Sequence, residues 1–142
     1  MATPPTHLDI HEIIEIKASA ETVFDALVHR FGEGNFAGEN KPMPMKIELW
    51  PGGRWYRDLG DNMGHLWGHV QSIKRPNLLE FYGQLFMSAP VSNHIIIRIT
   101  EEDGTSSLDF HHQAFGIFDA DQLDRLKEGW LEYLEVIKSD CE

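Results

Sequence analysis

The sequence predicts an α+β protein in which a curved antiparallel sheet of six to seven strands wraps around one long C-terminal helix. The segment 119–138 has the apolar spacing of an amphipathic helix, and most of the chain before it alternates like strands joined by short turns. One or two short helices fit after the first strand. Because a sheet with one apolar face needs a cover, we expect the terminal helix to lie across it.

Length and charge limit the function classes. The 142 residues predict a single domain covering 1–142, and the net charge of −11 argues against nucleic acid and anionic membranes as partners. No apolar run is long enough to span a membrane, and the N-terminus lacks the pattern of a signal peptide. The one cysteine, Cys141, cannot form an internal disulfide. We therefore expect a cytoplasmic protein.

The N-terminal part combines one strand and one helix. Residues 1–7 are expected to be a loose tail, and the alternation over 8–17 predicts a strand whose even-numbered side chains are buried. Ser19 is a good N-cap for a helix from Ala20 to about Arg30.

The next region is irregular and then becomes rich in strands. Glycines and prolines punctuate 32–44, so this loop either only connects its neighbours or, through Phe36, forms the rim of a pocket. Short turns such as Pro51-Gly52-Gly53 predict antiparallel neighbours. The expected strands span 45–50, 54–59, 65–73, 78–85, 93–100 and 106–115. The pattern does not decide which face of the first two is buried.

The terminal helix carries an apolar stripe, formed by Leu123, Leu126, Trp130, Leu134 and Ile137. Asp119 or Asp121 can cap its start. Gly129 lies within the helix, where glycine costs about 1 kcal/mol relative to alanine. Either the helix approaches the sheet closely there, or the missing side chain leaves room for another group.

Four segments together resemble one protein family. They are Trp50 to Trp55, Gly68 to Leu79, Leu108 to His112, and the helical Gly129-Trp130 with Leu134 and Lys138. In this order they are similar to members of the activator of heat-shock-protein ATPase homologue-like family, within the START or birch-pollen-allergen-like (SRPBCC) superfamily. The resemblance covers about residues 10–138.

The resemblance implies the helix-grip fold, with a hydrophobic cavity between the terminal helix and the sheet. We therefore expect a protein that binds a small apolar or amphipathic ligand. The alternatives are a cyclase- or hydrolase-type enzyme that uses the same cavity, and a regulator of a chaperone ATPase with a chaperone partner. A homodimer is also open, because the strand at the open end of a sheet can pair with a second copy.

The expected ligand-binding residues are mostly aromatic: Trp130, His112, Phe110, Trp55, Phe36, Trp67, Phe81 and Arg54. His112 should face the helix side of the sheet, where it is a hydrogen-bonded core histidine, a group that orients a ligand, or a general base. Arg54 either forms a solvated pair on the outer face or points inward toward a carboxylate or a ligand anion.

The histidines do not predict a metal site. His65 and His69 lie on an expected strand, where four residues span about 13 Å, too far for one ion with ligands at about 2 Å. His111 and His112 are adjacent and point to opposite faces. No phosphate loop or nucleophile motif occurs in the sequence, so we expect no cofactor and assign no catalytic residue.

Overall fold

A computed structural model describes residues 5–142 and confirms the α+β class. The elements in chain order are β1 (Thr6–Ile16), α1 (Ala20–Phe31), β2 (Phe36–Ala37), β3 (Lys41–Pro42), β4 (Lys46–Ile47), β5 (Arg54–Gly60), β6 (Met63–Lys74), β7 (Leu78–Gly83), β8 (Val91–Glu102), β9 (Thr105–Gly116), a 3-10 turn (Ala120–Gln122) and α2 (Leu123–Cys141). Seven of these strands form one antiparallel sheet in the order β1-β9-β8-β7-β6-β5-β4.

Strand β1 is the edge strand next to β9, with a register that runs from Thr6 opposite Gly116 to Ile16 opposite Ser106. The even-numbered side chains Leu8, Ile10 and Ile16 are buried, as the alternation predicts. The expected loose tail is wrong for Thr6 and His7, because both already pair with β9. Residues 1–4 of that tail lie outside the described residues.

Helix α1 begins where the sequence places it. The Ser19 side chain accepts a hydrogen bond from the Thr22 N–H, which satisfies one of the free donors of the first turn. Its apolar face is buried against the sheet and includes Phe24, Leu27 and Phe31. The later half of the loop at 32–44 holds the two-residue strands β2 and β3, which pair with each other, instead of a second helix.

The strand expected at 45–50 is wrong for most of its length. Only Lys46–Ile47 pairs with β5, and Trp50 is 57% exposed. The cause is the following turn, in which the Gly52 N–H donates to the Val70 carbonyl and the Val70 N–H donates to the Gly53 carbonyl. A Cβ on Gly53 would lie 1.9 Å from the Glu48 carbonyl oxygen, so only glycine allows this close approach.

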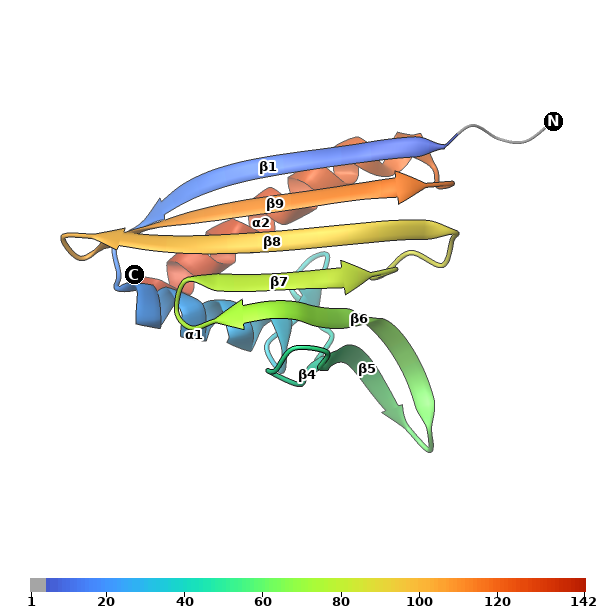
Figure 1. Cartoon of the computed structure of the whole chain (residues 1–142), viewed down its shortest axis with the longest axis horizontal. Helices are drawn as coiled ribbons and strands as arrows, with labels where there is room; N and C mark the ends of the chain where they lie inside the picture. The colour runs from blue at the N-terminus through green and yellow to red at the C-terminus, as the bar shows by residue number, and fades with distance from the viewer. Residues whose placement is uncertain (1–4) are drawn as a thin grey trace.

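Helix α2 lies across one face of the sheet (Figure 1), and with α1 it buries the core on that face. The buried residues of α2 are Trp130, Tyr133, Leu134 and Ile137. The helix begins later than expected, at Leu123, and its N-cap Gln122 makes no side-chain capping bond. Asp119 instead accepts the Asp121 N–H at the preceding 3-10 turn. Neither described helix is both long and apolar enough for a membrane span.

The β5–β6 hairpin bends away from the rest of the sheet (Figure 1). The pairing shifts by one residue within this hairpin, from Tyr56 opposite Leu66 to Trp55 opposite Gly68. Trp67 is therefore the extra residue of a β-bulge, a feature that increases local twist and bends the strand. The bend leaves space between the hairpin and α2, and this space is where the candidate site lies.

Candidate ligand-binding cavity

An apolar cavity of about 380 Å³ lies between α2, the end of α1, the loop that follows it and the hairpin strands β5 and β6. Its lining residues are Phe31, Asn35, Phe36, Ala37, Gly38, Met43, Trp55, Trp67, Phe86, Leu126, Gly129, Trp130 and Tyr133. Aromatic rings dominate this set.

Three buried rings form the floor of the cavity. Phe31 stacks almost parallel to Trp55, with ring centres 5.3 Å apart, and lies 6.1 Å from Trp130. The Trp55 indole N–H donates a 2.8 Å hydrogen bond to the Phe31 carbonyl, which satisfies the polar group of a buried ring. The floor is therefore a fixed aromatic surface.

More exposed rings form the rim. Phe36 stacks on Tyr133 with ring centres 4.8 Å apart. Trp67 lies edge-on to Trp55 at 5.1 Å, and Phe86 lies edge-on to Trp67 at 5.5 Å. Phe86 is 41% exposed although it is large and apolar, so the cavity opens to solvent beside it.

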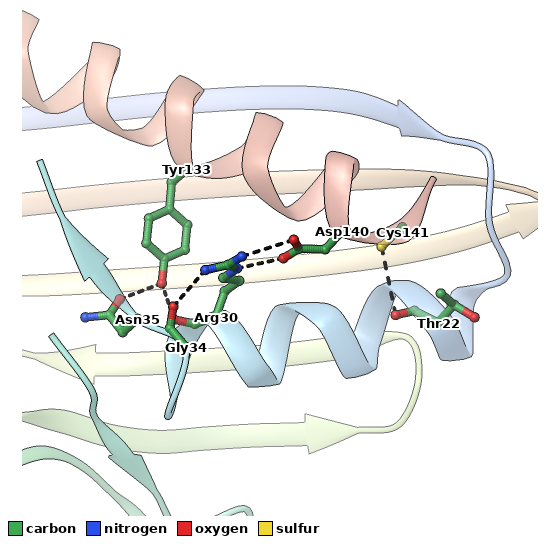
Figure 2. Close-up of polar contacts among 7 residues, drawn as sticks. All are labelled: Thr22, Arg30, Gly34, Asn35, Tyr133, Asp140 and Cys141. Carbon is green, nitrogen blue, oxygen red and sulfur yellow. Dashed lines mark hydrogen bonds and ion pairs between the residues drawn. The ribbon is translucent and has the colours of Figure 1, made fainter. Parts of the chain in front are cut away.

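A polar network holds the loop that follows α1 (residues 32–44, the rim loop) against both helices (Figure 2). The Arg30 guanidinium binds both carboxylate oxygens of Asp140 on α2, at 2.6 and 3.0 Å, and donates to the Gly34 carbonyl at 3.1 Å. The Tyr133 hydroxyl contacts the Arg30 carbonyl and the Asn35 side-chain oxygen. Burial raises the pKa of the Tyr133 hydroxyl, which therefore stays protonated and available as a donor.

Gly129 faces the cavity from α2. Outside the backbone of its own helix and the two adjacent residues, a Cβ at this position would meet no heavy atom within 4 Å, so a close approach of the helix to the sheet is not the reason for this glycine. The other interpretation, that the missing side chain leaves room, agrees with its place in the cavity lining.

His112 lies behind the floor, fully buried. Its Nδ1 accepts a 3.0 Å hydrogen bond from the Trp130 indole N–H, so the ring proton lies on Nε2 and is donated to the Asn93 side-chain oxygen at 2.7 Å. Burial lowers the pKa of His112 to about 4, with a smaller contribution from nearby histidines. The geometry is that of a neutral core histidine that orients Trp130.

Four of the eight residues expected to bind a ligand lie in the lining: Trp130, Trp55, Phe36 and Trp67. Phe110 and Phe81 are buried one layer deeper. The ring centre of Phe110 lies 4.5 Å from that of Trp130, and the ring centre of Phe81 lies 4.6 Å from that of Trp55. Arg54 lies on the outer face, where it binds Glu48 at 2.8 Å and lowers the pKa of that carboxylate to about 2. Of the two positions expected for Arg54, the solvated ion pair on the outer face is therefore the one that the structure shows.

Sequence reasoning missed Tyr133, Phe31 and Phe86 as lining residues. Tyr133 follows Trp130 by three positions, so the helical spacing could have placed it on the same face. Phe31 lies at the end of the predicted helix, on its apolar side. Phe86 had no signal, because it belongs to the irregular segment after β7.

The lining is mostly apolar. Its polar side chains are Asn35 and Tyr133, both held by the network of the rim loop, and stacking and burial are the interactions that the remaining surface offers. Among residues 5–142, no group of three potential metal ligands lies together.

The fold is the helix-grip fold of the START and birch-pollen-allergen-like superfamily. The chain belongs to the family described as Activator of Hsp90 ATPase homolog 1-like protein, whose model matches residues 17–141. A search of curated proteins gives no match.

Solved structures show the same fold at low sequence identity. An uncharacterised protein from Rhizobium leguminosarum is 16% identical, with a TM-score of 0.70 over 98% of both chains. The dimeric Aha1 from Colwellia psychrerythraea is 16% identical, with a TM-score of 0.67 over 95% of this chain and 96% of that one. The di-domain ARO/CYC StfQ of the steffimycin biosynthetic pathway is 9% identical, with a TM-score of 0.66 over 95% of this chain and 50% of that one.

Proposed function

We propose that the protein binds a small apolar or amphipathic molecule in the cavity between α2 and the β5–β6 hairpin. The observation that supports this most directly is an aromatic floor of Phe31, Trp55 and Trp130 beneath an open mouth. Ligand pockets typically occupy about 300–1,000 Å³ and are mostly apolar, with a few polar groups. The volume of about 380 Å³ and the Asn35–Tyr133 pair fit that description.

Other roles have less support. A cyclase- or hydrolase-type reaction needs a reactive group at the ligand, whereas His112 lies behind Trp130 and its lowered pKa makes it a weak base. The family name and the dimeric Colwellia protein suggest a chaperone partner or a second copy of the chain, and β1 has one unpaired edge for such a copy. We place the protein in the cytoplasm, where a single cysteine stays reduced.

Phenylnaphthylamine, an uncharged dye that fluoresces when it leaves water, tests the proposal. The wild-type protein should bind it, and Gly129→Leu should weaken that binding by at least about tenfold, because the added side chain occupies the cavity. Glu132→Leu places the same side chain on the exposed side of α2 and should leave the affinity unchanged. Equal affinities of both variants, or no binding by the wild type, would contradict the proposal.

A further inference from the structure

A second hollow adjoins the cavity along the β5–β6 hairpin. This hollow has a volume of about 460 Å³ and shares Met43, Trp67 and Phe86 with the first. Its titratable lining residues are Arg57 and His65. The aromatic cavity therefore adjoins a hollow whose ionisable groups are basic.

The register of the hairpin places these two groups together on the cavity side. Arg57 lies directly opposite His65, and side chains of such a pair emerge from the same face about 5 Å apart. Arg57 follows Trp55 by two residues on β5, which carries no extra residue there, so the basic pair shares a face with a tryptophan of the cavity. The distance from Trp55 to Arg57 is therefore about 7 Å along the strand.

Arg57 lines the second hollow without a carboxylate partner. Arg30, Arg54 and Arg75 each bind a carboxylate, whereas Arg57 is half-buried and forms no ion pair with the residues that the structure describes. Arg98 and Arg125 form no such pair either, but they line neither the cavity nor the second hollow. The carboxylate that follows it, Asp58, is bound by the Lys46 ammonium and the Gly60 N–H instead.

In the described part of the chain, no carboxylate that could pair with Arg57 lines the second hollow. Asp58 and Asp61 line a separate hollow at the end of the hairpin, which Arg57 and His65 also border, and neither aspartate lines the second hollow. A guanidinium left with unused donors at the exit of an apolar cavity is suited to an anionic oxygen group, which it can bind through two parallel hydrogen bonds. This arrangement is notable in a chain of net charge −11.

We propose that the molecule bound in the cavity is an anionic amphiphile. Its apolar body lies on the rings of Trp55 and Trp130, and its carboxylate, sulfonate or phosphate group binds the Arg57 guanidinium, with the His65 imidazole as a second donor. This inference rests on the proposed function and adds to it the charge of the ligand and the residues that select it.

A matched pair of dyes separates the two proposals. Anilinonaphthalene sulfonate carries an anionic group that phenylnaphthylamine lacks, while the aromatic bodies are alike. In Arg57→Gln, the Kd of the sulfonate should rise about tenfold or more, which is the effect of losing one charge-assisted hydrogen bond, and that of the neutral dye should stay the same. Arg54→Gln, which removes an arginine from the outer face of the same strand, should change neither Kd.

The outcomes distinguish the failures. If the wild type binds neither dye, the proposed function fails and this inference fails with it. If the neutral dye binds but Arg57→Gln and Arg54→Gln bind the sulfonate alike, only the anion site is wrong. If Arg57→Gln also loses affinity for the neutral dye, the dependence of wild-type binding on ionic strength provides the test. The Kd of the sulfonate should rise with ionic strength, and the Kd of the neutral dye should not. Equal salt dependence would overturn the anion site.

Discussion

The indole N–H of Trp130 donates a 3.0 Å hydrogen bond to Nδ1 of His112, which joins the centre of α2 to the core face of β9. The same histidine donates to Asn93 on β8, and Asn93 donates to the Gln84 carbonyl in the segment that carries Phe86. One hydrogen-bonded chain thus connects the floor of the cavity with its rim. Only a neutral His112 can make both of its bonds, because a protonated ring has no acceptor nitrogen.

Acid should therefore weaken the fold through His112. Its pKa is about 4 in the folded protein, below the ordinary value of 6.5, so the unfolded chain binds the proton more tightly. The contribution to the free energy of unfolding is complete above about pH 6.5 and is lost as the pH falls toward 4, with about 2 kcal/mol lost by about pH 5. Urea unfolding at these pH values measures the loss.

Other groups also titrate in this range, so the wild type is compared with His112→Gln, which keeps a donor and an acceptor without a proton equilibrium. The variant should show the smaller decline between about pH 7 and about pH 5. Parallel declines would mean that His112 does not stay neutral in the folded protein.

Tyr133→Phe should destabilise the protein by about 1–3 kcal/mol. The change removes only the hydroxyl, but it leaves the Arg30 carbonyl and the Asn35 side-chain oxygen without that contact in a buried place. Tyr82→Phe is the control, because Tyr82 is exposed on the sheet and its hydroxyl makes no hydrogen bond to the residues described. Chemical unfolding should separate the two variants, and similar stabilities would argue against the network of the rim loop.

Repetitive segments were predictable from sequence, because one local rule determines many residues in each. The alternation of β1, β8 and β9 and the spacing of α2 located the sheet, its cover and the burial of Trp130 and Phe110. The face of β5 was not predictable. It follows from the bulge at Trp67 and from the turn at Gly52 and Gly53, which depend on contacts with β6.

The site was predictable only where it coincides with such segments. Trp55, Trp67 and Trp130 lie on regular elements, and their size suggested the cavity wall. Phe86 and Met43 enter the lining from irregular segments whose positions are set by tertiary hydrogen bonds, such as that from the Leu85 N–H to the Trp67 carbonyl. His112 was placed on the correct face, but the indole that covers it could not be deduced from the strand alone.

Gly129→Ala tests whether the glycine of α2 serves the cavity rather than the fold. Apart from the backbone of the helix and the two adjacent residues, no heavy atom lies within 4 Å of an added Cβ, so alanine should fit without strain. It should raise the free energy of unfolding by up to about 1 kcal/mol, because glycine loses more conformational freedom in a helix. Thermal unfolding gives the direction of the change. A methyl group occupies far less of the cavity than leucine does, so the neutral dye should still bind Gly129→Ala with an affinity near that of the wild type. A destabilised Gly129→Ala variant would mean that the backbone needs glycine, and the open space beside it would then no longer explain why the helix lacks a side chain at this position.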